Sequence, residues 1–399
     1  MSTKNRKHLF IVGLLLVLTL LAACAPAPTP APTAAPPTAA PKPTVAPTVA
    51  PTAAPVATTA PTAAPTAAPK PTEATPNFAG KTLNVSFFAF NVDLINKNIN
   101  QPFEKKYGAK IVYDTGNNAD RLAKLVARKD NPNIDVVAFS TEFLLRAVQA
   151  GVIQPYDPAK IKNLDQLHDW AKDPLGNKMG VGYTISGYTM FYRSDKVKEP
   201  LTSWKDLWRP ELKGYVSLPD ITTTNGPATI ALIAKAWGGD LNNDQIAWDK
   251  LAELKPSLIT AYKNSAELIT LVQQDEVWVS GYSTFAWGNL LNTKKPLKSV
   301  VPKEGLVGFV NTLSVVKGTP NAELAQAYID FMISEQVQLA EALDLVDSPA
   351  NKNVKVPADI AAKLTYGDDV IKSLMFLNDQ QIAAKRPGWI DRWNKLMAK

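Results

Sequence analysis

The tract from Ala25 to about Pro76 most strongly limits what this chain can fold into. It consists almost wholly of proline, alanine and threonine, and it contains no aromatic residue. Such a composition cannot bury enough apolar surface to offset the entropy lost when a chain becomes ordered. Dense proline favours the extended polyproline II conformation, so fifty-odd residues reach on the order of 150 Å at roughly 3.1 Å per residue. The tract therefore predicts a semi-rigid spacer, and the folded part of the chain is expected to begin near Asn77.

The residues before this tract predict export. Lys4, Arg6 and Lys7 precede an apolar stretch from Leu9 to Leu21, which is too short for a comfortable membrane span and is typical of a signal peptide, here residues 1–23. The stretch ends in Leu-Ala-Ala-Cys, and small residues before a cysteine resemble the lipobox of bacterial lipoproteins. Cys24, the only cysteine, is the predicted lipidation site. The mature chain then has no disulfide, and its fold must rest on a hydrophobic core.

The charge of the chain argues against a nucleic-acid partner. Its formal net charge is +7, but the predicted signal peptide carries three positive charges and no negative ones, which leaves +4. The linker, residues 24–77, carries two lysines and one glutamate, so about +3 remains on the folded part. Spread over more than three hundred residues, this excess does not favour a phosphate-binding surface.

Local patterns after the linker alternate between strand and helix. Residues 81–90 alternate apolar and polar side chains, which predicts a strand, and residues 119–128 carry apolar side chains at helical spacing. Residues 134–139 form an apolar run interrupted only by Asp135, which is typical of a strand buried on both faces. A further amphipathic helix follows Pro320, with Asn321 as its expected N-cap. The predicted class is α/β, and the length favours a division into lobes.

Three predicted strand-to-helix junctions are rich in small hydroxyl side chains. They lie at residues 136–142, 216–227 and 277–284. In open α/β sheets, ligands bind at the carboxyl ends of the strands, where helix N-termini offer unpaired N–H groups. Thr222 to Asn225 form a polar loop suited to a carboxylate or phosphonate group. Each junction also has a purely structural alternative to ligand binding. In that alternative, Ser140 or Thr141 only caps a helix, the second junction is a plain turn, and Tyr282 at the third only packs against the core.

Two segments resemble a known family. Residues 202–214 read TSWKDLWRPELKG and precede a strand that ends in Pro-Asp, and residues 301–305 read VPKEG, followed by FVNTLSV at 309–315. These segments are similar to the "SW-DLW-PE-KG" and "PKEG" stretches of periplasmic spermidine/putrescine-binding proteins. The likeness covers most of residues 81–399 in order and spacing, and the chain is identified as similar to the extracellular solute-binding proteins (family 1) of ABC transporters.

The resemblance implies a fold and a division of the chain. It implies the type II periplasmic binding fold, in which two α/β lobes joined by hinge crossovers close over a solute. The folded domain would span residues 78–399. Lobe 1 would comprise residues of about 78–187 and 314–360, and lobe 2 residues of about 188–313 and 361–399.

The resemblance also implies a binding site. In polyamine-binding members, aromatic residues sandwich the alkyl chain and acidic residues hold the ammonium groups. This chain departs from that pattern at two places. Asn311 stands where a carboxylate is expected after the second aromatic residue, and Ile221 and Thr224 stand where the loop near residue 220 would carry acidic residues. A buried ammonium without carboxylate partners costs several kcal/mol, so a zwitterion or an anion with a carboxylate or phosphonate group is at least as compatible as a polyamine. The junctions and the resemblance together predict ten ligand-binding residues: Phe90, Ser140, Glu142, Thr223, Thr224, Asn225, Ser265, Tyr282, Phe309 and Asn311.

Other functions find less support in the sequence. Ferric-ion binders use paired tyrosines with a histidine, but there is no Tyr-Tyr pair, and His168 is the sole histidine after signal removal. No G-x-S-x-G or H-E-x-x-H motif occurs, whereas a glycosidase-like carboxylate pair stays open. Trp204, Trp208 and Trp237 are interpreted as core residues. We therefore expect no enzyme, cofactor or metal, with an extracytoplasmic hydrolase or a stalked surface protein as the alternatives.

The sequence thus predicts a lipid-anchored, extracytoplasmic binding protein, at the cell surface or in the periplasm. Its expected partners are a small-molecule solute, the membrane through its lipid anchor, and an ABC permease with a cytoplasmic ATPase. The chain is expected to be a monomer.

Overall fold

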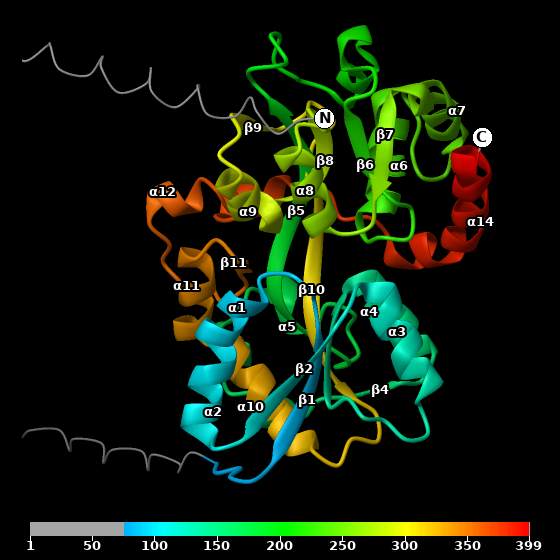
Figure 1. The fold of residues 1–399 in the computed structure, drawn as a ribbon. Helices are drawn as coiled ribbons and strands as arrows, with labels where there is room; N and C mark the ends of the chain where they lie inside the picture. Colours follow the sequence, from blue (N-terminus) through cyan, green and yellow to red (C-terminus); the bar gives the residue numbers. More distant parts are fainter. Residues whose placement is uncertain (1–75, 399) are drawn as a thin grey trace, which may run out of the picture. The chain divides into compact units, whose positions relative to one another are not determined.

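Eleven strands of the described residues, 76–398, form one mixed sheet in the computed structural model (Figure 1). The predicted signal peptide (1–23), the lipidation site Cys24 and nearly all of the linker (24–77) lie outside the described residues. The strands are β1 (Thr82–Phe87), β2 (Lys110–Thr115), β3 (Val136–Ser140), β4 (Ile153–Gln154), β5 (Val181–Arg193), β6 (Val216–Pro219), β7 (Leu258–Tyr262), β8 (Val279–Ser283), β9 (Leu297–Val300), β10 (Val307–Val316) and β11 (Ser348–Pro349).

Helices connect and cover these strands, which confirms the predicted α/β class. They are α1 (Val92–Ile95), α2 (Gln101–Tyr107), α3 (Asn118–Ala127), α4 (Thr141–Gln149), α5 (Asp169–Lys172), α6 (Asn225–Ala236), α7 (Gln245–Leu254), α8 (Ser265–Gln273), α9 (Trp287–Asn292), α10 (Ala322–Met332), α11 (Glu335–Leu343), α12 (Ala358–Ala361), α13 (Asp368–Ser373) and α14 (Asp379–Ala398). A π-helical turn at 96–100 joins α1 to α2.

The sheet repeats one arrangement twice. Its main order is β2-β1-β3-β10-β5-β8-β6-β7. The groups β2-β1-β3 and β7-β6-β8 each consist of three parallel strands. In each group, the strand that comes first in the sequence lies in the middle. Each triplet is flanked by one antiparallel strand, β10 beside β3 and β5 beside β8. The carboxyl ends of each parallel triplet therefore meet at one edge.

Buried apolar side chains divide the described residues into two halves. The first half comprises β1–β4, α1–α5, α10 and α11, and its core includes Phe103, Phe139 and Tyr328. The second half comprises β6–β9, α6–α9 and α14, and its core includes Trp204 and Tyr188. Strands β5 and β10 contribute to both cores because they run from one half into the other, as Figure 1 shows. All thirteen residues of β5 are buried, as expected for a strand covered on both faces.

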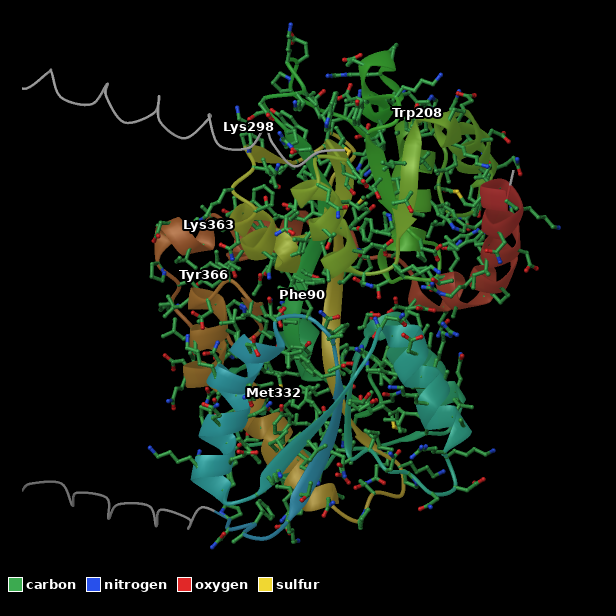
Figure 2. The ribbon with its side chains drawn as sticks, in the orientation of Figure 1. Phe90, Trp208, Lys298, Met332, Lys363 and Tyr366 are labelled. Carbon is green, nitrogen blue, oxygen red and sulfur yellow. The ribbon has the colours of Figure 1, made fainter. Side chains whose placement is uncertain are left out.

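The three tryptophans interpreted as core residues lie in the second half. Trp204 is fully buried, and Trp208 and Trp237 pack against the same core with ring centroids 4.4 Å apart. Figure 2 shows Trp208 in this half, Met332 in the first half and Phe90 between the two.

Two residues expected to cap helices stand at the N-cap positions, but their side chains form no capping hydrogen bond. Asn321 stands at the N-cap position of α10, but its side chain donates hydrogen bonds to Asp135 Oδ1 at 3.2 Å and to the carbonyl oxygen of Thr82 at 3.3 Å. Ser140 stands at the N-cap of α4, again without a capping hydrogen bond. The predicted strand at 81–90 ends at Phe87, because residues 88–90 leave the sheet.

Candidate functional site

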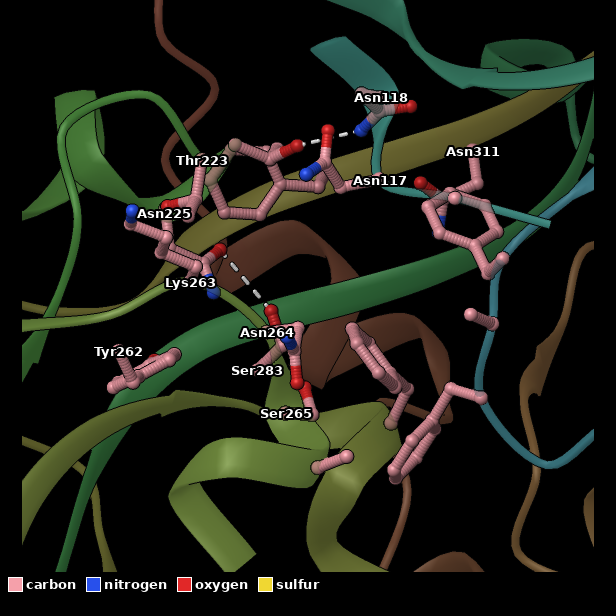
Figure 3. A pocket seen from close by; sticks show the side chains of 18 of the residues that line it. Asn117, Asn118, Thr223, Asn225, Tyr262, Lys263, Asn264, Ser265, Ser283 and Asn311 are labelled. Atoms are coloured by element: carbon pink, nitrogen blue, oxygen red, sulfur yellow. Dashed lines mark hydrogen bonds between the residues drawn. The ribbon is translucent and has the colours of Figure 1, made fainter. Parts of the chain in front are cut away.

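A pocket of about 480 Å³ lies where the carboxyl ends of five strands meet, two from one parallel triplet (β1 and β2) and three from the other (β6, β7 and β8). Its wall consists of residues 88–90 after β1, 116–118 and Asp120 after β2, 222–225 after β6, 262–266 at the end of β7, and Ser283 and Phe285 at the end of β8. The crossing strands add Ser186 from β5 and Phe309 and Asn311 from β10. Both halves thus contribute to one pocket (Figure 3), whose volume is typical of sites for small organic molecules.

Three helices begin at this pocket: α3, α6 and α8. The amides of Asn118 and Ala119 at the start of α3, and those of Ser265 and Ala266 at the start of α8, donate to no acceptor within residues 76–398. The first amides of a helix have no intrahelical acceptor and carry the positive end of the helix dipole. The pocket wall therefore offers free backbone donors and a positive potential.

The floor of the pocket carries two buried polar side chains without partners. Phe309 and Asn311 alternate along β10 and face the pocket, whereas Val310 between them is buried. Asn311 is 9% exposed, and Ser186, which pairs with Phe309 across the strands, is 2% exposed. Neither side chain forms a hydrogen bond with another described residue. Both are thus free to bind a solute.

Side-chain hydrogen bonds connect the two halves beside the pocket. Asn118 Nδ2 of α3 donates to Thr224 Oγ1 at 2.8 Å, and Ser140 Oγ lies 3.4 Å from both of these atoms. Ser283 Oγ donates to Asn225 Oδ1 at 3.1 Å within the second half. Dashed lines in Figure 3 mark the bonds from Asn118 and Ser283.

Few charged groups surround the pocket. Asp120 and Lys263 line it, and both residues are exposed. Arg121 is fully buried behind the wall, where its guanidinium donates to the carbonyl oxygen of Gly116 and to Asn118 Oδ1, both at 2.6 Å. The guanidinium also stacks on Phe88, 4.0 Å from the ring centroid. Burial lowers the pKa of Arg121 to about 9, and the group has no carboxylate partner among residues 76–398.

A second, smaller cavity of about 30 Å³ adjoins the pocket. The two share Phe88, Phe90, Phe285 and Asn311. The remaining wall of the small cavity is formed by Phe87, Asn91, Ile95, Tyr183, Val346 and Asp347. The rings of Phe90 and Phe285 meet edge to face, with centroids 5.6 Å apart. This region is therefore aromatic, with a single carboxyl group.

Seven of the ten predicted site residues line the pocket: Phe90, Thr223, Thr224, Asn225, Ser265, Phe309 and Asn311. Whether they bind a solute stays a prediction. Ser140 lies one layer behind them, in contact with Thr224.

Glu142 does not line the pocket. It is 4% exposed, and its carboxylate accepts two hydrogen bonds from Arg386 of α14, at 3.0 and 2.9 Å. Both oxygens of this carboxylate are held in the ion pair with Arg386, and Glu142 is not part of the pocket lining. In this structure Glu142 joins two helices.

Tyr282 does not line the pocket either. It is 1% exposed, and its hydroxyl donates to Ser299 Oγ at 2.7 Å on the other side of β8. Successive side chains of a strand point to opposite faces. Because Ser283 faces the pocket, its neighbour Tyr282 packs in the second core.

Several lining residues were missed from the sequence, mainly at the ends of β2 and β7. Asn117 and Asn264 cap α3 and α8 by accepting hydrogen bonds from Asp120 N and Glu267 N. An asparagine three residues before an acidic residue is a recognisable helix-start signal. A search for polar residues where a strand is followed by a helix, as made at the other three junctions, would have identified Asn117 and Asn264.

The described residues contain no group of three or more His, Cys, Asp or Glu side chains that can hold a metal ion. Within the same part of the chain, no helix combines the length and the apolar character needed to cross a membrane.

Comparisons with known proteins agree on one family. Residues 98–366 match the family model for bacterial extracellular solute-binding protein. Spermidine/putrescine-binding periplasmic protein 1 of Haemophilus influenzae is 26% identical over 69% of this chain and 78% of its own length. The putrescine-binding periplasmic protein SpuD of Pseudomonas aeruginosa is 29% identical over 66% of this chain and 77% of its own length.

Solved structures show the same fold. An ABC transporter protein from Clostridium perfringens is 32% identical, with a TM-score of 0.66 over 79% of this chain and 99% of that one. The spermidine/putrescine ABC transporter substrate-binding protein of Streptococcus pneumoniae has a TM-score of 0.64 at 19% identity, over 79% of this chain and 99% of that one.

Proposed function

The chain belongs to the family of bacterial extracellular solute-binding proteins, and from that premise we propose that it captures a small polar organic solute in its pocket and delivers it to an ABC importer. Members of this family are binding proteins and not enzymes. The single observation that carries the proposal is the pocket itself. Strand ends and helix starts from both halves surround a volume of about 480 Å³, with unpartnered polar groups on its floor.

Capture would proceed by closure of two lobes. We retain the division predicted from the sequence: lobe 1 at about 78–187 and 314–360, and lobe 2 at about 188–313 and 361–399. The two separate cores support it, because a domain with two cores joined by few strands can bend at the crossings. A solute that contacts both walls would stabilise the closed arrangement.

The chain would act outside the cytoplasm, tethered by a lipid on Cys24 and lifted from the membrane by its linker. The closed, loaded domain would be recognised by a permease that works with a cytoplasmic ATPase. The solute would be polyamine-like, amino-acid-like or phosphonate-like, since the wall combines aromatic rings with amides and hydroxyls.

Thermal denaturation of the purified chain with a panel of solutes tests the proposal. The panel contains polyamines, amino acids, aminophosphonates and neutral sugars. A solute at a hundred times its dissociation constant stabilises the folded state by about 2.7 kcal/mol. We expect at least one class to raise the melting temperature, and native mass spectrometry to show one solute per chain.

A matched pair of variants locates the binding. Ser265→Trp places an indole at the start of α8, inside the pocket, whereas Thr270→Trp places one on the exposed side of the same helix. The first variant should lose the thermal shift and the second should keep it. A shift that survives in Ser265→Trp would place the solute elsewhere, and the absence of a shift with every compound would refute the proposed function.

A further inference from the structure

The charged groups around the site are separated into two ends. Helix starts and Lys263 occupy the wall of the pocket, and Asp347 occupies the adjoining aromatic cavity. We propose that the solute is a small zwitterion, whose anionic group is bound at the helix starts and whose cationic group is bound between the phenylalanine rings and Asp347. This inference rests on the proposed function and specifies the solute class of the same site.

The anionic end is best defined at the start of α8. Ser265 and Ala266 present free amides, and the hydroxyl of Ser265 has no partner among the described residues. Lys263, just before them, also lines the pocket and forms no ion pair within residues 76–398. Amides, a hydroxyl and an ammonium group together are suited to a carboxylate or phosphonate.

Two independent observations support a ligand in this pocket, the first an anionic group and the second a polar ligand in general. Arg121 holds a buried positive charge behind the opposite wall, where no carboxylate of the described residues forms an ion pair with it, although Asp114 and Asp120 act on it from a greater distance. The floor carries the unpartnered side chains of Ser186 and Asn311, which are at least nine-tenths buried. Buried polar groups are almost always hydrogen-bonded in native proteins, so these two indicate a polar ligand that spans the floor.

The cationic end has a different chemistry. Phe87, Phe88, Phe90 and Phe285 surround the small cavity, and aromatic faces attract cations. Asp347 closes it, and its carboxyl group accepts a hydrogen bond only from Thr184 Oγ1, at 3.2 Å, with no cation in contact among the described residues.

The geometry of this end also limits the size of the cationic group. A volume of about 30 Å³ accommodates an ammonium head but not an alkyl chain. Burial and the nearby Glu341 carboxyl raise the pKa of Asp347 well above its ordinary value, as expected for a carboxyl group that lacks a positive partner. A bound ammonium would supply that partner.

Solutes with two like charges fit this arrangement less well. A diamine would direct one ammonium at the helix starts and Lys263, and a dianion would direct one carboxylate at Asp347. An unpaired or repelled buried charge costs several kcal/mol. Asp120 offers the only carboxylate in the pocket lining, and it is exposed at the edge, where water and salt screen it.

Compounds matched in length and different in charge test the inference. One set is γ-aminobutyrate, putrescine and succinate, and the other is 2-aminoethylphosphonate, ethylenediamine and ethylphosphonate. Binding to the full chain is measured by isothermal titration calorimetry. We expect the zwitterion of at least one set to bind tenfold or more tightly than the other members of that set. The inference is overturned if the protein binds putrescine, ethylenediamine, succinate or ethylphosphonate more tightly than the zwitterion of the same set.

Variants test the two ends separately. Asp347→Asn should weaken zwitterion binding by roughly ten- to hundredfold without weakening butyrate or ethylphosphonate. Asp344→Asn is the matched control, because Asp344 lies outside both cavities and pairs with Lys97. Lys263→Ala should weaken the zwitterion and the anions but not butylamine. If Asp347→Asn fails to fold, the inference is judged by whether Lys263→Ala weakens the zwitterion and the anions but not butylamine.

The outcomes separate this inference from the proposed function. Unchanged zwitterion affinity in Asp347→Asn, or in Lys263→Ala, overturns the charge assignment. If no charged compound binds but a neutral sugar does, the function stands and the inference fails. If neither charged compounds nor sugars bind, both fail.

Discussion

Arg386 of α14 joins the two halves through a buried ion pair with Glu142 of α4. Its Nε and Nη2 atoms donate to the two carboxylate oxygens at 3.0 and 2.9 Å, and each side chain is 5% exposed. Its Nη1 atom donates to the carbonyl oxygens of Ile221 at 3.0 Å and Thr223 at 3.2 Å, in the loop that lines the pocket. Glu142→Gln would remove the negative charge and leave the guanidinium buried without compensation.

The expected cost follows from this burial. Breaking a buried pair by neutralising one partner costs about 3–5 kcal/mol. With an unfolding entropy of about 2.1 cal/mol/K per residue, the roughly 320 described residues give about 0.7 kcal/mol/K. Glu142→Gln should therefore lower the melting temperature by about 4–7 °C. Burial also lowers the pKa of Arg386, while Glu142 opposes this shift.

A double-mutant cycle measures the pair. The free energies of unfolding of Glu142→Gln, Arg386→Met and the double variant are obtained by urea denaturation. We expect a coupling energy of at least about 1.5 kcal/mol, within the range for residues in direct contact. Arg146→Met is the control, because Arg146 lies 3.7 Å from the same carboxylate but is 35% exposed, and it should cost less than about 1 kcal/mol. Additivity within about 0.5 kcal/mol would refute the reasoning.

Three further variants test individual residues. Tyr282→Phe removes the hydrogen bond to Ser299, so stability should fall by about 1 kcal/mol while solute affinity in calorimetry stays unchanged; a marked affinity loss would place Tyr282 in the pocket. Asn311→Asp adds a carboxylate to the pocket floor and should raise the affinity ratio of putrescine to γ-aminobutyrate at least tenfold, and an unchanged ratio would exclude Asn311 from cation recognition. Burial raises the pKa of Glu341 from 4.5 to about 7, so the folded state binds more protons than the unfolded state between these values. Stability should therefore fall by about 2–3 kcal/mol as pH rises through this window, and Glu341→Gln should remove that fall in urea titrations at pH 4.5 and 7.5.

Local patterns in the sequence predicted the element types but not the pairing of the strands. The alternation predicted at 81–90 and the apolar run predicted at 134–139 are visible in short windows, and they coincide with the strands β1 (82–87) and β3 (136–140) apart from their ends. The pairing of β10 with β5 joins Phe309 to Ser186, more than a hundred residues apart. No local period encodes such a contact, so the sheet order required the structure.

The site was predictable where it depended on strand ends and unpredictable where it depended on side-chain direction. Asn225 follows a strand and begins a helix, and this rule predicted its place in the pocket lining, whereas Ser265, in the same position after β7, was predicted only from the family resemblance. Neighbouring side chains of a strand point to opposite faces, so only one of Tyr282 and Ser283 can face the pocket. Because β8 is buried on both faces, its sequence does not alternate between polar and apolar residues and does not show which one it is. Glu142 forms its ion pair with Arg386, 244 residues away, and a junction residue gives no sign of such a partner.

The backbone and the side chains contribute differently to selectivity in this fold. Helix starts at the ends of parallel strands arise from topology, so any chain with this sheet order directs amides and positive dipole ends at its pocket. A cationic solute is then favoured only if side chains supply enough negative charge. Here the lining supplies one exposed carboxylate, Asp120, and the half-buried Asp347 supplies the one carboxyl group of the adjoining cavity. On the proposed charge assignment, one negative end opposite a positive wall selects for a solute with one charge of each sign, because the wall repels the second ammonium of a diamine and Asp347 repels the second carboxylate of a dianion.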